Sequence, residues 1–194
     1  MFAAGFCLSF LRRTGETDKS HKNMSDQLMI KIVTHSFAQH HEWLVNTLQM
    51  CDLIRQDRGN DYGFEWAIQT AIGQYLIANV GRHNLRCVRL NQPYPHNRRN
   101  GRQIRYDVFF RHTNKENVTR EVIVELKTVV DGDLGYTRRY DLNRWFPENS
   151  VVYFLVVSYP YQPQPPAQPD LGGTTPVIMG RIHNYPYLLY RKTG

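Results

Sequence analysis

The sequence has few cysteines and no long apolar run, and both features exclude classes of protein. Its three cysteines are too few and too widely spaced for a disulfide scaffold or a cysteine-based zinc site. The longest apolar runs, such as residues 151–157, fall far short of the roughly 18 residues that a membrane-spanning helix needs. We therefore expect a protein of a reducing, cytoplasmic compartment with no membrane partner.

Two short catalytic signatures are also missing from the sequence. There is no Gly-rich phosphate loop, and no H-E-x-x-H motif accompanies His35, His40 and His41. We interpret these histidines as solvated or helix-capping residues rather than as metal ligands.

The first 24 residues do not have the pattern of a targeting peptide. Their apolar stretch precedes two arginines, which reverses the order of a secretory signal, and two acidic residues are atypical of a mitochondrial presequence. We expect residues 1–24 to be a disordered leader, with Met24 as an alternative natural start. Organellar targeting by residues 1–23 is the weaker interpretation. Residues 25–194 are expected to form one domain.

Hydrophobic periodicity divides the rest of the chain into helices followed by strands. Helix-like spacing covers residues 26–55 and 61–79, the second with Asp61 as N-cap and Gly81 beyond its end. Short β-rich runs follow at 85–90, 104–110, 122–130, 151–157 and 177–182. A helix is predicted at 136–146, ended by Pro147, and a proline-rich loop at 160–176.

The order of these elements predicts the fold class. Three consecutive strands indicate a meander, and the helix before the fourth strand indicates a crossover to a parallel strand. The sequence therefore predicts an α/β protein with a central mixed β-sheet flanked by helices.

Charged residues interrupt two strands that are otherwise apolar. Glu125 and Lys127 lie two residues apart in one run, so alternation places both on one face, about 7 Å apart along the strand. Asp107 interrupts the preceding strand in the same way. If the two strands pair through a hairpin at 111–120, Asp107 lies beside Glu125.

The helix at 61–79 adds a third carboxylate. Glu65 falls within the apolar stripe that contains Ile72 and Leu76, so we expect it to point at the sheet. Like charges brought together need a counter-charge, which Lys127 supplies only in part. A divalent cation would supply the rest, and oxygen ligands favour Mg²⁺ or Mn²⁺. The alternative is a set of structural ion pairs.

Taken together, Glu65, Asp107, Glu125 and Lys127 resemble the PD-(D/E)XK nuclease superfamily. The spacing Asp-x17-Glu-x-Lys and the helix–strand–strand–strand–helix–strand order within residues 61–158 carry the resemblance. Tyr106 departs from it by standing where the family has a proline. The resemblance implies a restriction-endonuclease-like core in α-β-β-β-α-β order, with the N-terminal helix as an extension.

The resemblance also implies a mechanism. Asp107, Glu125 and the Leu126 carbonyl would hold Mg²⁺, with Mn²⁺ as a substitute, and Glu65 would support the site. Lys127 would orient the attacking water or stabilise charge on the phosphate.

The basic charge is concentrated beside these residues. The formal net charge is +7, and Asp107 is the only acid between residues 82 and 111, which hold eight arginines. A cationic hairpin loop at 93–102 is expected to grip DNA, because arginine suits phosphate and guanine contacts. The predicted nucleic-acid-binding residues are Tyr94, Arg98, Arg99, Arg102, Arg105, Arg138 and Arg139.

These features favour a metal-dependent DNA endonuclease of restriction, repair or mobile-element type. A homodimer is the simplest way to cut both strands of a duplex, because one site cuts one strand. The first alternative is a catalytically inactive nucleic-acid-binding or assembly module with the same fold. The second is a small-molecule enzyme with a Mg²⁺–carboxylate site, which the arginine block disfavours.

Overall fold

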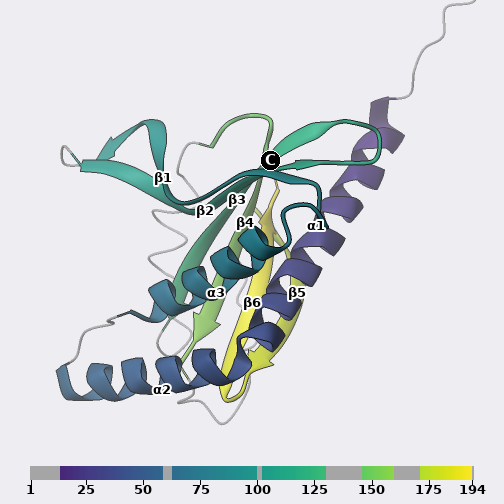
Figure 1. Cartoon of the computed structure of the whole chain (residues 1–194). Helices are drawn as coiled ribbons and strands as arrows, with labels where there is room; N and C mark the ends of the chain where they lie inside the picture. Colours follow the sequence, from purple (N-terminus) through teal and green to yellow (C-terminus); the bar gives the residue numbers. More distant parts are fainter. Residues whose placement is uncertain (1–13, 59–62, 100–101, 130–145, 160–170, 194) are drawn as a thin grey trace, which may run out of the picture.

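A computed structural model describes residues 14–58, 63–99, 102–129, 146–159 and 171–193 (Figure 1). Within these residues the helices are α1 (Thr14–Gln39), α2 (His41–Arg58) and α3 (Phe64–Ala78). The strands are β1 (Leu85–Arg99), β2 (Arg102–Thr113), β3 (Thr119–Val129), β4 (Ser150–Ser158), β5 (Thr174–Ile182) and β6 (Tyr185–Lys192). The predicted α/β class is confirmed.

The six strands form one mixed sheet in the order β1-β2-β3-β4-β6-β5. β1, β2 and β3 pair antiparallel as a meander, and β4 pairs parallel to β3. Both arrangements were predicted. The most continuously apolar strands, β3 and β4, lie at the centre, where both faces of a strand are covered.

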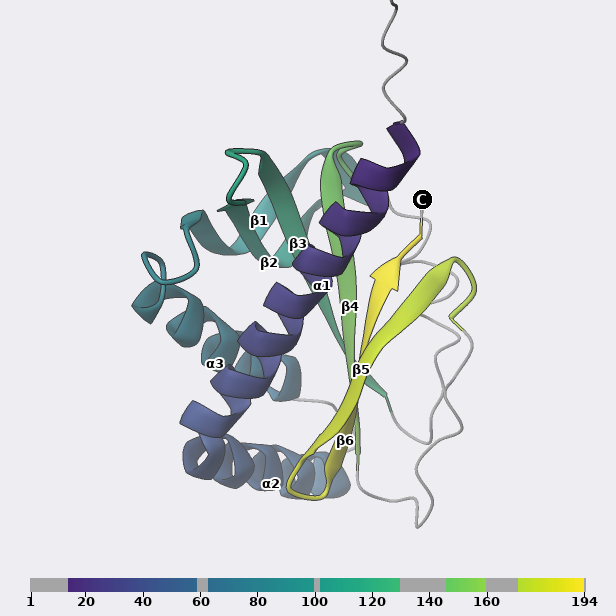
Figure 2. The same cartoon turned by 90° about the vertical axis from the view of Figure 1, so that its right-hand side faces the viewer.

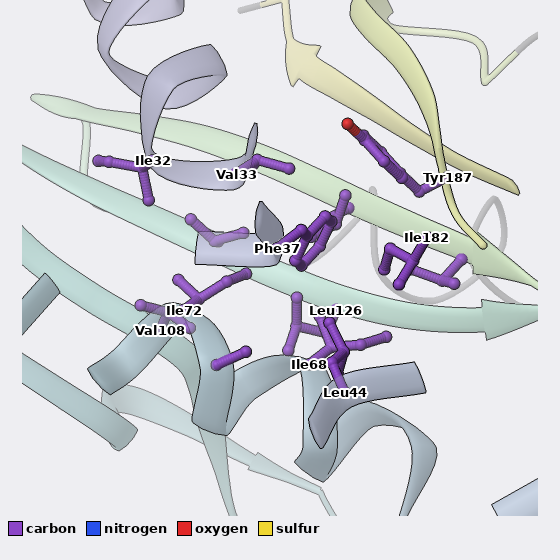
Figure 3. Close-up of a cluster of buried hydrophobic side chains, with 14 of the residues drawn as sticks. Ile32, Val33, Phe37, Leu44, Ile68, Ile72, Val108, Leu126, Ile182 and Tyr187 are labelled. Carbon is purple, nitrogen blue, oxygen red and sulfur yellow. The ribbon is translucent and has the colours of Figure 1, made fainter. Parts of the chain in front are cut away.

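The helices cover one face of this sheet. α1 runs diagonally across the strands, and α2 and α3 pack beside it (Figure 2). Ile32 and Phe37 of α1 meet Ile68 of α3 over Val108 and Leu126 of the sheet (Figure 3). The opposite face carries a second apolar cluster, from alternate residues of the same strands, which the described helices do not cover.

The N-terminal helices differ from the prediction in their boundaries. The helix expected at 26–55 is two helices that meet at His40. α1 begins at Thr14, so residues 14–24 of the expected leader are helical, because no proline interrupts this polar stretch before the packed part of α1. Residues 1–13 lie outside the described part. Among the described helices, none has the length and apolarity needed to cross a membrane.

α3 also begins later than expected. Gly63 precedes it with φ 84°, a left-handed conformation that a helix cannot include, and the predicted cap Asp61 lies outside the described residues. The C-terminal boundary is close to the expected one, since Asn79 closes the helix with hydrogen bonds to the Tyr75 and Leu76 carbonyls.

Most of the cationic hairpin loop predicted at 93–102 is instead part of a β-ribbon. β1 extends to Arg99 and β2 starts at Arg102, with Arg98 paired to Gln103. Pro93 and Pro95 favoured a loop over a strand. However, β1 is the edge strand, and an edge strand tolerates proline. Two register shifts along β1 mark bulges. The ribbon extends away from α2 and α3, at the upper left of Figure 1.

The C-terminal region holds one strand more than expected. β6 was missed because Pro186 and the terminal basic residues broke its apolar pattern, and β5 begins at Thr174, inside the predicted loop 160–176. The helix expected at 136–146 lies outside the described residues except for Phe146, which is not helical.

Candidate functional site

Glu125 is buried and Lys127 is half-buried near the C-terminal end of β3. Glu125 is 1% exposed, and the Lys127 side chain is 14% exposed, with Nζ 3.9 Å from Glu125 Oε2. Both alternate in step with Ile123 and Val129, which pack on the sheet face away from the helices. The two side chains therefore share one face, as predicted, and form an ion pair with each other.

Asp107 bonds to the backbone of β3 at the point where strand pairing stops. The β2–β3 ladder continues only as far as Val108 opposite Val124. Beyond it, the Leu126 N–H donates to Asp107 Oδ2 at 2.7 Å. The carboxylate thus takes the place of a backbone acceptor that a continued ladder would supply. This end of β3 is open to side chains because β2 has left it.

The side-chain alternation of β2 changes at the place where β2 leaves β3. Tyr106 and Phe109 both pack into the cluster on the far face, with their rings 6.3 Å apart, although they are three positions apart in the strand. Strict alternation would put them on opposite faces, so β2 departs from regular strand geometry between these residues. Asp107 sits within this departure.

Glu65 takes the next N–H along the same edge of β3. Its Oε1 accepts a hydrogen bond from the Thr128 N–H at 3.1 Å. Leu126 and Thr128 are two residues apart, so their N–H groups point toward the same side of the strand. The carboxylates of Asp107 and Glu65 therefore line one edge of β3. The prediction that Glu65 points at the sheet is confirmed.

Gln69 is a site residue that the sequence reading missed. It is buried one turn after Glu65 on α3, and its amide donates to the Asp107 backbone carbonyl and to Asn91 Oδ1. The amide thus ties α3 to β2 beside the point of divergence. A polar residue four positions after Glu65, on the same helical stripe, was the signal that could have found it.

Tyr106 brings a neutral phenol close to the acidic group. Burial raises its pKa to about 12, and the negative charges of Glu125 and then Glu121 add to the effect. The phenol therefore keeps its proton at neutral pH. Its ring also stacks against Phe146, 6.3 Å away, so a residue beyond the predicted catalytic strand packs on this site.

The three carboxylates share the end of β3 but are held in different ways. Asp107 and Glu65 bond to the strand edge, whereas Glu125 lies on the far face with Lys127. Among the described residues, no three His, Cys, Asp or Glu side chains are grouped so as to hold a metal ion. A single ion shared by all three remains a prediction.

The predicted nucleic-acid-binding residues are only partly described. Arg105 is exposed on β2, and its guanidinium donates to the Asn91 carbonyl at 3.1 Å. The backbones at four further positions belong to the β1–β2 ribbon, but their side chains lie outside the described part: Tyr94, Arg98, Arg99 and Arg102. Arg138 and Arg139 lie wholly outside it.

Comparison with protein-family models, with characterised proteins and with solved structures gave no match. The nuclease resemblance therefore rests on the sequence pattern alone.

Proposed function

We propose that the protein is a metal-dependent nuclease that hydrolyses DNA phosphodiester bonds, with the restriction-endonuclease-like arrangement of its core. One observation carries the proposal: three carboxylates and a lysine gather around the last residues of β3, where β2 departs from it. A basic ribbon extends from β2, one of these two strands, and its partner β1.

The donor chemistry of this end fits a hard divalent cation. Carboxylate oxygens are hard donors, and the Lys127 ammonium lies beside the buried carboxylate of Glu125. Asp107, Glu125 and the Leu126 carbonyl would hold Mg²⁺ or Mn²⁺, and Glu65 would support them. When bound, the ion supplies polarisation of the phosphate and a more acidic water.

The chain's own residues set the geometry of hydrolysis. Lys127 places an ammonium where charge develops on the phosphate. A water oxygen forms the new bond to phosphorus as the bond to one ester oxygen breaks, and that oxygen leaves with a proton. Gln69 fixes the β2 backbone at Asp107, so the carboxylate keeps its position relative to β3.

The β1–β2 ribbon would hold the DNA. The major groove of B-DNA admits a two-stranded β-ribbon, and arginine makes bidentate contacts with phosphate and guanine. Arg98, Arg99 and Arg102 lie at register positions near the ribbon's tip, while Arg105 lies nearer its base. A homodimer would present two such sites for the two strands of a duplex.

One observation favours a second candidate, a catalytically inactive DNA-binding module with the same fold. Asp107 and Glu65 each accept a backbone N–H, and Glu125 pairs with Lys127, so every one of these groups also has a structural role. Such a protein would bind DNA through the same ribbon without cutting it.

A cleavage assay separates the two candidates. Wild-type protein is incubated with supercoiled plasmid and Mg²⁺ or Mn²⁺, beside Asp107→Asn and Glu121→Gln. Asparagine keeps an oxygen for the Leu126 N–H, so the fold is retained while the charge is lost. Glu121 is the matched control, because it is a carboxylate on the neighbouring strand β3 that pairs with Arg111 on the surface.

The nuclease proposal predicts nicking or linearisation by wild type and Glu121→Gln. EDTA should abolish cutting, and Asp107→Asn should reduce it by at least about a hundredfold. DNA binding without cutting of duplex, single-stranded or branched substrates would reject the nuclease and favour the binding module.

A further inference from the structure

A cationic pocket lies at the opposite end of β2 and β3 from the carboxylates. Its volume is about 430 Å³. α1, the turn between α3 and β1, and the β2–β3 hairpin all contribute to its walls. The charged and titratable side chains that line it are Lys31, Arg82, His83, His112 and Lys115. No part of the candidate nuclease site lines it.

The lining carries positive charge without acidic compensation. Lys31, Arg82 and Lys115 are exposed cations from three separate segments, and no Asp or Glu is among the described residues of the pocket wall. Glu116 follows Lys115 in the hairpin turn but does not line the pocket. The space therefore suits an anion, which would meet ammonium and guanidinium groups from several sides.

Two of the walls are tied to each other. The Asn84 side chain donates to the Thr113 carbonyl at 2.9 Å, and the Thr113 N–H donates to the Asn84 carbonyl at 3.2 Å. In the hairpin, Asn114 Oδ1 accepts N–H groups from Glu116 and Val118. These bonds hold the lining segments in place before any ligand arrives, which lowers the ordering cost of binding.

The histidines of the pocket are held among other positive groups. Tyr75 Oη lies 2.9 Å from His83 Nε2 and 3.3 Å from His35 Nδ1, which fixes the His83 ring. Burial lowers the pKa of His83, and Arg82, Lys31 and His35 lower it further.

His112 is affected in the same direction. Burial lowers its pKa, and the neighbouring His83 adds a smaller effect. A bound anion would reverse these shifts, because it would offset the surrounding positive charge.

We propose that this pocket binds the phosphate group of a phosphorylated small molecule, at a site separate from the candidate nuclease centre. A phosphate dianion matches the cations in charge, and about 430 Å³ lies within the usual range of small-molecule pockets. Lys31 and Arg82 donate to the phosphate oxygens, and His83 and His112 take up protons as it binds. Lys115 supplies a further positive charge from the β2–β3 hairpin.

The test is an NMR titration of the imidazole signals of the full-length protein with inorganic phosphate, and then with a nucleoside 5′-monophosphate. The His83 and His112 signals should shift saturably, and the pKa of both should rise. Lys31→Gln and Arg82→Gln should each weaken binding about tenfold, the effect of losing one charge-assisted hydrogen bond. Arg181→Gln is the matched control, an exposed arginine on β5 that should leave binding unchanged.

Three results would overturn the proposal. The first is no saturable shift at either histidine in wild-type protein, a readout that does not depend on the folding of any variant. The second is an equal loss of binding in Arg181→Gln, which would indicate unspecific attraction. The third is a shift of these signals by duplex DNA lacking 5′-phosphates but not by the small phosphates, which would make the pocket part of a DNA surface.

Discussion

The two ends of β3 carry opposite charge and are built differently. Where β3 begins, cations line an open pocket between α1 and two turns. Where it ends, carboxylates bond to its backbone or are buried beside it. Under our two proposals, both ends would meet a phosphate, but in different ways. The basic end would bind it directly, whereas the acidic end would need a cation between its carboxylates and the phosphate.

The largest effect on stability is expected from breaking the ion pair at the acidic end. Lys127→Met takes the ammonium away from a carboxylate that is 1% exposed. We expect the free energy of unfolding to fall by about 3 kcal/mol, the usual cost of removing one partner of a buried pair. Urea unfolding followed by circular dichroism measures the change.

A double variant controls for this prediction. Glu125→Leu combined with Lys127→Met replaces both charges by apolar groups, which is often nearly neutral. It should therefore be more stable than Lys127→Met alone. Equal losses in both variants would show that the ion pair does not couple these residues.

A smaller effect is expected at the edge of β3. Glu65→Ala removes the acceptor of the Thr128 N–H and should lower the free energy of unfolding by about 1–2 kcal/mol. Glu65→Gln keeps an oxygen acceptor, so it should lose less stability while still losing a negative charge. If the glutamine variant is as unstable as the alanine variant, the hydrogen bond is not what Glu65 contributes.

The histidines of the basic end should make the free energy of unfolding depend on pH. The lowered pKa values of His83 and His112 mean that the unfolded chain binds more protons as pH falls through about 6.5. Their contribution is therefore fully present above that pH and declines below it. The urea midpoint of the wild-type protein should decrease between about pH 7.5 and pH 5.5, and that of His83→Gln should decrease less. An identical decrease in both proteins would contradict this assignment.

The smallest effect is expected between the two ends. Arg111 and Glu121 form an exposed ion pair of 2.9 Å on neighbouring strands. Glu121→Gln should change the free energy of unfolding by less than about 1 kcal/mol, because solvent screens surface pairs. A larger loss would show that charge matters along the whole strand and not only at its ends.

Much of the fold could be predicted from local pattern. Alternating and apolar runs located β3 and β4, and the helical stripe placed Glu65 toward the sheet. The extents of β1 and β6 were harder to predict, because both strands contain proline. Whether a strand tolerates proline depends on where the residue lies in the assembled sheet. That information lies in the pairing of distant strands and not in the strand's own sequence.

The candidate site was predictable in its residues but not in its contacts. Spacing alone brought Asp107, Glu125 and Lys127 together as a set. It could not show that β2 diverges at Asp107, where a break in alternation places Tyr106 on the far face, because this break appears only in the tertiary packing. For the same reason Gln69, which bonds to the β2 backbone at that point, was missed.

The most direct test of the two-ended account is an NMR titration of the amide signals of β3 and its neighbours with Mn²⁺, a paramagnetic substitute for Mg²⁺. The account predicts that the Leu126 and Thr128 signals broaden first, while those of His83 and His112 remain sharp. Asp107→Asn should weaken the broadening, and Glu121→Gln should not. Uniform broadening along the strand, or none at Leu126 and Thr128, would contradict a cation site at the acidic end.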